Sequence, residues 1–318
     1  MALEDFLSVI EKHPRFFLAT HVNPDGDGIG SLLALSLGLG EKGKEIWPYL
    51  ADELPRPYQF LPGRELLRFH LPPDKDWVAI ILDCGEARRL GEEAEAFVEG
   101  LAEVLVLDHH EVSGSLGSLR HVELTYATAA LVYKLLELMG VKLSREIALN
   151  LYTAIFSDTG GFRFRETNAE TFTLAQRLVE AGVNPAEVAE KLTENHSLSR
   201  FCLLKKALSR LELFSGGKVA FSFLTHADYL HCRASKADSD DFATMFRGIE
   251  GVEVSVLLKE FQPGEVSVSL RSRGRVNVAT FAARFGGGGH RCAAGFRAKS
   301  KLEELVTLLR QELEALTS

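Results

Sequence analysis

The sequence predicts an α/β protein with two domains, an N-terminal one built on a parallel sheet with helices on both faces and a smaller C-terminal α/β one. In the first half, short apolar runs alternate with helical patterns, which is typical of a parallel sheet. After about residue 215 the strand-like runs are more closely spaced. The length of 318 residues also exceeds one ordinary domain. We therefore predict domains at 1–190 and 216–318, joined by a helical linker at 191–215.

The elements of the first domain follow from periodicity and from start and stop signals. An acidic, amphipathic start predicts a first helix over residues 1–16 rather than a signal peptide. Buried strands are predicted at 15–19, 44–50, 76–84 and 102–110. Helices are predicted at 30–40, 92–101, 128–140, 144–158, 168–182 and 184–192.

The linker and the second domain are predicted in the same way. A long amphipathic stretch at 197–214 predicts a connecting helix that ends before the turn sequence SGGK. Strands are predicted at 218–225, 252–261 and 265–272, and helices at 240–251, 276–286 and 302–316.

Composition indicates a soluble globular protein. Hydrophobic residues make up 46% of the chain, and no apolar run approaches the roughly 18 to 20 residues that span a bilayer. The four cysteines, Cys84, Cys202, Cys232 and Cys292, form neither a CxxC pair nor a dense framework. We therefore expect reduced thiols and a cytoplasmic location, with no membrane partner.

The charge is unevenly distributed. The net charge is -8, but residues 266–298 contain six arginines and no acidic residue. This segment predicts a local anion-binding surface on an acidic protein. Its run of four glycines before His290 would let backbone N–H groups approach an anion. The predicted phosphate contacts are Arg271, Ser272, Gly287, Gly288, Gly289, His290 and Arg297, whereas Arg273, Arg275, Arg284 and Arg291 can equally be surface residues.

Potential metal ligands follow three predicted strands and end one helix. In a parallel sheet the carboxyl ends of the strands meet at one edge, where ligands bind. We expect these side chains to gather there: His21, Asp25, Asp27, Asp83, Asp108, His109, His110 and Asp158. So many carboxylates would repel one another without cations among them. A pair of divalent ions would relieve the repulsion and activate a water. Mixed imidazole and carboxylate ligands favour Mn²⁺ over Ca²⁺ or Mg²⁺, with Fe²⁺, Co²⁺ and Zn²⁺ as alternatives. Gly26 and Gly28 are expected to give a tight turn that points Asp25 and Asp27 at different ions.

The motifs that carry these residues resemble a known family. The segments HVNPDGDGIGS, LDCGE, LDHHE and FSDTGGF resemble the four acidic motifs of the DHH phosphoesterase superfamily, in the same order. The segments VSVSLRSRG and VNVATFAARFGGGGHRCAAGF resemble the DHHA1 domain and its GGGH loop. The length is similar to the bacterial group of nano-RNases and phosphatases of 3'-phosphoadenosine 5'-phosphate (pAp).

The resemblance implies a role for each matching residue. His21, Asp25 and Asp83 would hold one metal ion, and Asp83 would bridge to a second. The second ion would be held by Asp27, Asp83, His109 and Asp158. Asp108 would orient the ligands, and His110 would face the scissile phosphate.

The resemblance also implies the substrate class. Short RNA, linear dinucleotides and pAp would bind at the metal centre and at the C-terminal domain. The alternatives are a cyclic-dinucleotide phosphodiesterase, a polyphosphate or pyrophosphate hydrolase, and a non-catalytic nucleotide- or RNA-binding module. Whether the chain forms a homodimer is left open.

Overall fold

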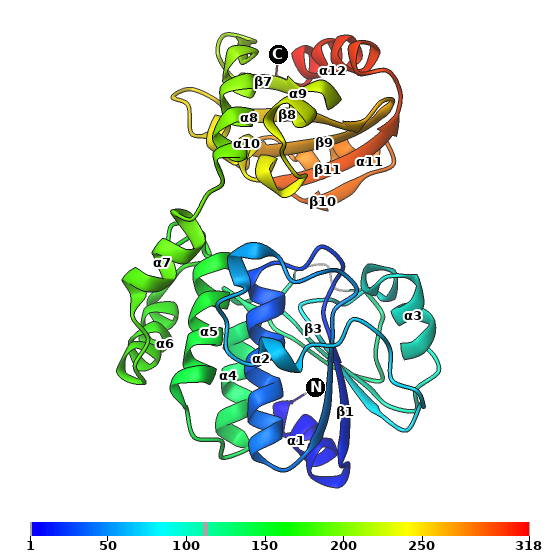
Figure 1. Ribbon diagram of the computed structural model, residues 1–318, viewed down its shortest axis with the longest axis vertical. Helices are drawn as coiled ribbons and strands as arrows, with labels where there is room; N and C mark the ends of the chain where they lie inside the picture. Colours follow the sequence, from blue (N-terminus) through cyan, green and yellow to red (C-terminus); the bar gives the residue numbers. More distant parts are fainter. Residues whose placement is uncertain (1, 111–113, 318) are drawn as a thin grey trace. The chain divides into compact units, whose positions relative to one another are not determined.

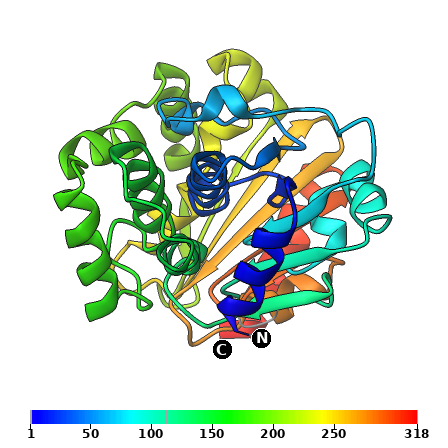
Figure 2. The same cartoon turned by 90° about the horizontal axis from the view of Figure 1, so that it is seen from below.

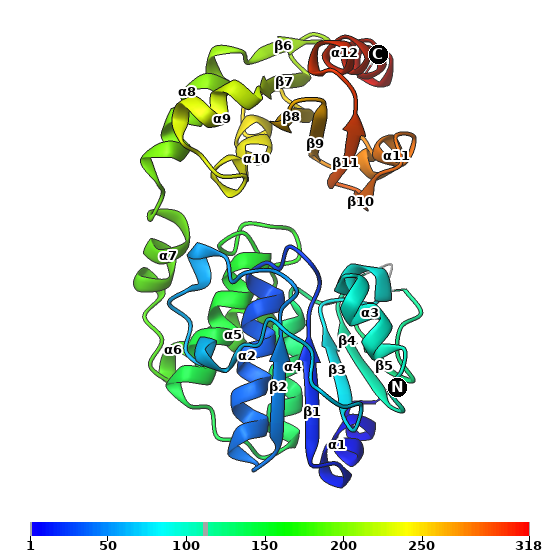
Figure 3. The same cartoon turned by 45° about the vertical axis from the view of Figure 1, so that its right-hand side comes forward.

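The computed structural model describes residues 2–110 and 114–317, and the chain divides into two compact units, residues 1–195 and 196–318 (Figure 1). The first unit contains the predicted parallel sheet. Its five strands are all parallel and lie in the order β2-β1-β3-β4-β5 (Figure 3). Their bounds are β1 Arg15–Ala19, β2 Glu45–Tyr49, β3 Val78–Leu82, β4 Val104–Asp108 and β5 Leu119–Val122.

Alternating residues of the central strands enter two different cores. Phe16 and Leu18 of β1 pack in the larger core with α1, α2, α4 and α5, whereas Phe17 and Ala19 face α3. Helices therefore cover both faces, as the sequence predicts for a buried parallel sheet. The helices of this unit are α1 Leu3–Lys12, α2 Gly26–Glu41, α3 Glu92–Val98, α4 Thr128–Leu138, α5 Arg145–Asp158, α6 Ala169–Glu180 and α7 Pro185–Thr193. The short 3₁₀ helices are η1 Arg56–Tyr58, η2 Arg64–Leu66 and η3 Ala87–Leu90.

Helix α2 packs very closely on α5, and glycine makes this possible. Figure 2 shows α2 end-on beside the green helices α4 and α5. A Cβ on Gly30 would lie 2.5 Å from the backbone oxygen of Asn150, and one on Gly26 would lie 2.4 Å from Cβ of Ser157. Gly26 and Gly28 lie in the first turn of α2, so the predicted tight turn between Asp25 and Asp27 is wrong. These glycines are required by close contacts with other elements.

The second unit is built on a six-stranded mixed sheet, in the order β10-β11-β9-β8-β7-β6. Its strands are β6 Glu212–Phe214, β7 Val219–Leu224, β8 Val254–Gln262, β9 Glu265–Ser272, β10 Gly288–His290 and β11 Ala293–Lys299. Its helices are α8 Leu198–Ser209, α9 His226–Cys232, α10 Phe242–Arg247, α11 Val278–Ala283 and α12 Leu302–Thr317, with the 3₁₀ helix η4 Ala237–Ser239. One core lies between the sheet and α11 and α12, and a second lies between β7–β8 and α8, α9 and α10.

The predicted connecting helix is shorter than expected. Helix α8 ends at Ser209, and Glu212–Phe214 forms strand β6, which pairs antiparallel with β7. The turn between them, Ser215 to Lys218, places Ser215, Gly216 and Gly217 at positive φ, which favours a hairpin over a helix end. Leu203 and Ala207 of α8 are fully buried in the core of the second unit, so α8 is part of that unit.

Two of the four cysteines are not free thiols. Cys202 of α8 and Cys232 of α9 form a disulfide, with their Cα atoms 5.6 Å apart, so the expectation of four reduced thiols is wrong. The two cysteines are 30 residues apart and are brought together only by the packing of α8 on α9, so no local sequence pattern predicts their disulfide. Cys84 and Cys292 are free.

No helix within residues 2–110 and 114–317 has both the length and the apolar composition needed to cross a bilayer.

The α2–α5 contact predicts opposite effects of alanine at two glycines of one helix. Gly30→Ala places a Cβ against the backbone of Asn150 and should lower the free energy of unfolding by about 1–3 kcal/mol. Gly40→Ala, in the exposed last turn of α2 with nothing within 4 Å, should leave stability unchanged or raise it by up to about 1 kcal/mol. Urea unfolding followed by circular dichroism measures both, and equal effects would contradict the close contact.

Candidate metal centre

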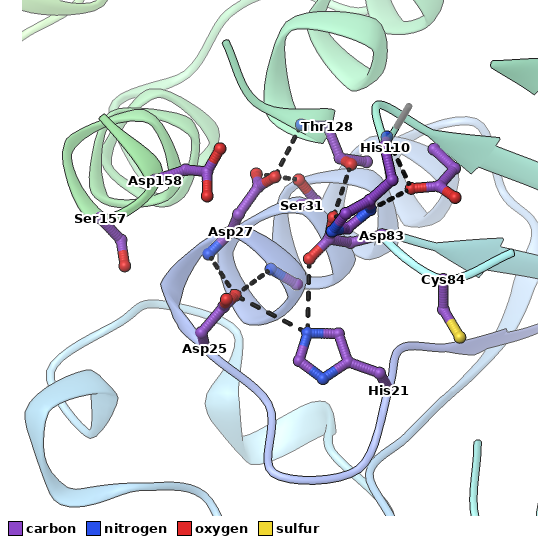
Figure 4. Close-up of polar contacts among 12 residues, drawn as sticks. His21, Asp25, Asp27, Ser31, Asp83, Cys84, His110, Thr128, Ser157 and Asp158 are labelled. Atoms are coloured by element: carbon purple, nitrogen blue, oxygen red, sulfur yellow. Dashed lines mark hydrogen bonds and ion pairs between the residues drawn. The ribbon is translucent and has the colours of Figure 1, made fainter. Parts of the chain in front are cut away.

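The predicted ligands of the first unit converge at the carboxyl edge of its sheet (Figure 4). His21 follows β1, Asp83 follows β3, and His109 and His110 follow β4. Asp158 is the last residue of α5, whose end approaches the start of α2. Asp25 and Asp27 lie at the start of α2, so the structure brings together residues positioned by five elements: β1, α2, β3, β4 and α5.

The first group comprises His21, Asp25 and Asp83, whose ligand atoms lie within 4.8 Å of one another. His21 Nε2 lies 3.4 Å from Asp83 Oδ2 and 3.9 Å from Asp25 Oδ1. His21 Nδ1 lies 2.9 Å from the carbonyl oxygen of Val22. Because a carbonyl only accepts, Nδ1 donates to it, which leaves Nε2 facing the carboxylates. Burial favours the neutral ring, but the contact with Asp83 and the charge of Asp25 outweigh it and raise the pKa of His21, so without a cation Nε2 tends to hold a proton that a metal ion would replace.

The second group comprises Asp27, His109 and Asp158. His109 Nε2 lies 3.8 Å from Asp27 Oδ2, 3.5 Å from Asp158 Oδ2 and 3.4 Å from Asp83 Oδ1. The Nδ1 atom of His109 lies 3.0 Å from the carbonyl oxygen of Thr125. This contact fixes the orientation of the His109 ring, as the contact with the Val22 carbonyl does for His21.

Asp83 lies between the two groups. Its Oδ2 atom faces His21, and its Oδ1 atom faces His109. The residue is 2% exposed and has a φ of 58°, a left-handed conformation that is unfavourable for a residue with a side chain. The backbone strain therefore coincides with the carboxylate that both groups share.

Asp27 is held by the start of α4. The backbone N–H groups of Thr128 and Ala129 donate to its two carboxylate oxygens at 2.6 and 3.1 Å, and the Ser31 hydroxyl donates at 3.2 Å. The Thr128 hydroxyl donates to Asp83 Oδ1 at 3.1 Å. Sequence reasoning missed Thr128, although a threonine that begins a predicted helix was a visible signal.

Asp25 has a second structural role. Its Oδ1 atom accepts hydrogen bonds from the backbone N–H groups of Asp27 and Gly28, so Asp25 is also the N-cap of α2. The helix start and the ligand cluster therefore share one carboxylate.

His110 completes a third group with Asp83 and His109, whose ligand atoms also lie within 4.8 Å of one another, and it pairs with Asp108. His110 Nδ1 lies 2.6 Å from Asp108 Oδ1, and the backbone N–H of His110 donates to the same oxygen at 3.3 Å. Asp108 is 1% exposed. His110 Nδ1 also lies 3.6 Å from Asp83 Oδ1, so His110 borders the shared carboxylate.

Burial and mutual repulsion shift the pKa values of the cluster. Burial, with the charge of Asp83 added, raises the pKa of Asp27 to about 7. Burial and the charge of Asp27 raise the pKa of Asp158 well above its ordinary value. For His109, burial favours the neutral ring, but contact with Asp83 and the charge of Asp27 outweigh it and raise the pKa to about 11. Without cations, the cluster therefore retains protons that bound metal ions would displace.

The donor set fits divalent metal ions. Carboxylate oxygens and imidazole nitrogens bind such ions at about 2.0–2.2 Å, so donor atoms 3.4–3.9 Å apart can share one ion. The 3.4 Å contacts between Nε2 and carboxylate oxygen are also longer than good hydrogen bonds. The acidic residues can thus hold metal, as the sequence predicts.

In the second unit, the arginines of the acid-free segment differ in their partners. Arg273 donates to the carbonyl of Val252, Arg275 pairs with Glu253, Arg284 with Glu312, and Arg291 donates to the carbonyl of Gly274. Arg297 is exposed on β11, and Arg271 is half-buried on β9 and contacts the hydroxyl of Thr244.

Arg271 and Ser272 lie on opposite faces of β9. Ser272 is fully buried, and its hydroxyl donates to the carbonyl of Arg291, so the structure does not bring it to the surface that carries Arg271. Lys259 of β8 lies on the same face as Arg271 because their strands pair antiparallel in register. Sequence reasoning missed this buried lysine, which lies in an apolar strand pattern and whose Nζ atom is 3.9 Å from Asp240 Oδ1.

The glycine run forms the edge strand β10 and the turn before it. Gly287 and Gly289 are required by packing, since a Cβ on either would lie 2.2–2.5 Å from a backbone oxygen of β11. Nothing lies within 4 Å of a Cβ on Gly288. The backbone of His290 pairs with Ala293, and its side chain lies outside the described part of the structure.

Comparison with known proteins agrees with both units. Residues 15–155 match the N-terminal domain of the DHH family, and residues 216–315 match the DHHA1 domain. The chain is 38% identical to the bifunctional oligoribonuclease and PAP phosphatase NrnA of Thermus thermophilus, over 93% of this chain and 90% of that protein.

Solved structures show the same fold. The structure of an exopolyphosphatase-related protein from Bacteroides fragilis matches with a TM-score of 0.92 and 25% identity, covering 99% of this chain and 96% of that one. The exonuclease RecJ bound to manganese matches with a TM-score of 0.58 and 17% identity, covering 100% and 94%. The chain therefore belongs to the DHH/DHHA1 family of phosphoesterases, in the group of the bifunctional oligoribonucleases and PAP phosphatases.

Proposed function

We propose that this protein hydrolyses short oligoribonucleotides and linear dinucleotides, and that it converts pAp to AMP. The observation that carries this proposal is the pair of ligand groups that share Asp83, in a chain 38% identical to an oligoribonuclease and PAP phosphatase. A cytoplasmic location remains part of the proposal.

The proposed centre holds two divalent ions, and its donor set favours Mn²⁺. His21, Asp25 and Asp83 would hold one ion, and Asp27, Asp83, His109 and Asp158 the other. Bound ions would supply an activated water and would neutralise charge on the phosphate oxygens. The carbonyls of Val22 and Thr125 keep the two imidazoles oriented.

His110 is the proposed contact with the scissile phosphate. The carboxylate of Asp108 holds Nδ1, so Nε2 lies at the opposite edge of the ring. A protonated His110 would stabilise negative charge on the phosphate oxygens or protonate the leaving oxygen. Asp108 is then a positioning residue that acts through His110.

The second unit is the proposed anchor for another phosphate of the substrate. Arg271 and Arg297 lie on one face of β9 and β11, and the buried Lys259 of β8 lies on the same face; Arg297 and Lys259 both pair with Ser267, four residues from Arg271. The outer edge of β10 presents backbone N–H groups that are not needed for its pairing with β11. Two-pronged contacts from guanidinium groups suit phosphate. His290 remains a proposed contact.

A substrate panel tests the proposal. With Mn²⁺ present, the protein should hydrolyse pAp and RNAs of two to five nucleotides faster than longer RNA, cyclic dinucleotides, polyphosphate or pyrophosphate. Released products are measured by chromatography, and EDTA should abolish turnover. Preference for long RNA, a cyclic dinucleotide or polyphosphate would overturn the substrate assignment.

Asp83 is predicted to control both ions. Removing a residue that only hydrogen-bonds to a metal ligand lowers metal affinity or activity by about 10- to 100-fold. Asp83 is itself a proposed ligand of both ions, so Asp83→Asn should lower turnover by more than about 100-fold. Metal analysis should show fewer than two ions per chain, with an unchanged circular dichroism spectrum. Asp76→Asn, at an exposed carboxylate before β3, is the matched control and should retain activity. Near-normal turnover of Asp83→Asn would contradict a shared ligand.

Asp158 is predicted to destabilise the protein when metal is absent. Its pKa is raised on folding, so the folded state binds the proton more tightly than the unfolded state does. The free energy of unfolding therefore falls as pH rises from the ordinary pKa of 3.8 towards the folded pKa. In EDTA at pH 7.5, Asp158→Asn should raise Tm, by about 2–4 °C for each kcal/mol regained. The difference should disappear below pH 4.

With excess Mn²⁺ the wild type should have the higher Tm of the two, because binding the ion stabilises the wild type more than it stabilises Asp158→Asn. Thermal scans with EDTA and with Mn²⁺ measure both effects. A variant less stable than the wild type in EDTA would argue against repulsion in this cluster.

A further inference from the structure

A second positively charged site lies in the first unit, outside the ligand groups. It is a cavity of about 260 Å³ formed where the 3₁₀ helices η1 and η2 meet α7. The residues that line it are Arg56, Pro57, Gln59, Phe60, Arg64, Lys191 and Asn195. Three of these are cations, and none is acidic.

The three cations have no partner of their own. Arg56, Arg64 and Lys191 are exposed, and within the described residues their side chains form no hydrogen bond, ion pair or ring contact. By contrast, the neighbouring Arg68 contacts the ring of Trp47 and donates to two backbone carbonyls. Like charges that share one cavity repel one another, so an anion bound there would be stabilised.

The other lining groups define the kind of anion. Gln59 and Asn195 add amide donors, and the ring of Phe60, which packs partly on the main core, adds an apolar wall. Guanidinium groups grip phosphate in a two-pronged way. A cavity of 260 Å³ is small even for an ordinary ligand site, so it suits one phosphate with an adjoining sugar or base.

The 3₁₀ helix η1 connects this cavity to the ligand groups. Tyr58 of the same helix is not among the lining residues; its hydroxyl is 3.5 Å from Ser157 Oγ, and a Cβ on Gly26 would lie 3.0 Å from its ring. Ser157 and Gly26 are direct neighbours of Asp158 and Asp25 in the chain. Because Arg56 and Tyr58 are two residues apart, their Cα atoms lie within about 7 Å.

We propose that this cavity binds a non-scissile phosphate of an oligoribonucleotide whose scissile phosphate lies at the metal centre. The inference rests on the proposed function and adds a substrate subsite to it. A substrate with several phosphates would use the cavity, whereas a small ester with one phosphate would not.

The variant Arg64→Gln tests the proposal, with Lys12→Gln as its control. Lys12 is an exposed cation at the end of α1, before β1, on the edge of the sheet away from the ligands. We expect Arg64→Gln to raise the KM for a five-nucleotide RNA by about 10-fold, since a hydrogen bond between charged groups is lost. Hydrolysis of bis(p-nitrophenyl) phosphate should not change, and Lys12→Gln should leave both substrates unaffected.

Salt dependence gives a second readout. Each phosphate contact with a single strand contributes a slope of about 0.7 in the logarithm of affinity against the logarithm of salt concentration. The slope for the five-nucleotide RNA should therefore become shallower by about that amount in Arg64→Gln. Arg56→Gln and Lys191→Gln should show the same trend, since they line the same cavity.

Three outcomes would overturn the inference. One is an unchanged KM and salt slope for RNA in all three variants, while the wild type cleaves RNA normally. Another is an equal loss on RNA and on the small ester, which indicates a structural defect. The third is that added AMP changes the rate of ester hydrolysis in the wild type but not in Arg64→Gln. That result would indicate that the cavity binds a free nucleotide rather than part of the substrate. Failure of the proposed function would look different, because the wild type itself would not cleave RNA.

Discussion

The crowding of three aspartates, Asp25, Asp27 and Asp158, around Asp83 is the constraint on which the first unit depends. Desolvation and like charge make this arrangement unfavourable unless cations or protons are bound. Several features of the surrounding fold hold the carboxylates in this arrangement. Asp83 adopts a left-handed backbone, the N–H groups that begin α4 hold Asp27, and glycines bring the start of α2 against α5. Each of these features is explained if the carboxylates they position bind metal ions.

The division of the cluster into two groups follows from how its histidines are held. A backbone carbonyl fixes Nδ1 in both His21 and His109, so Nε2 of each ring points at a different oxygen of Asp83. His110 is held differently, by the carboxylate of Asp108. This difference is the structural basis of the proposed separation between two metal-ligand histidines and one that faces substrate, although His110 also lies within ligand distance of Asp83 and His109.

Much of the fold and of the metal centre was predictable because the signals are local. Apolar strands, helix caps and the sequence order of His21, Asp83, His109 and Asp158 are all visible in the chain. The strands β5, β6, β10 and β11 and the helix α9 were not predicted. They are short or rich in glycine and polar residues, and they are stabilised by their neighbours rather than by their own periodicity. Lys259 was missed because its partner Asp240 is more than 15 residues away in the chain. Thr128 also has a distant partner, Asp83, although its place at the start of a predicted helix was visible in the sequence.

By itself the sequence determined the two-domain α/β class, the residues that gather at the sheet edge and the acid-free segment of the second domain. Strand periodicity and the rule that parallel strands end at one edge are enough for these conclusions. Only the tertiary structure decided which oxygen of Asp83 faces which histidine, why Gly26 and Gly30 must be glycine, and which arginines already have partners. Only the fold, too, joined Cys202 to Cys232 and placed Arg56, Arg64 and Lys191 around one cavity. These features depend on contacts between distant segments, and such contacts leave no trace in local sequence patterns.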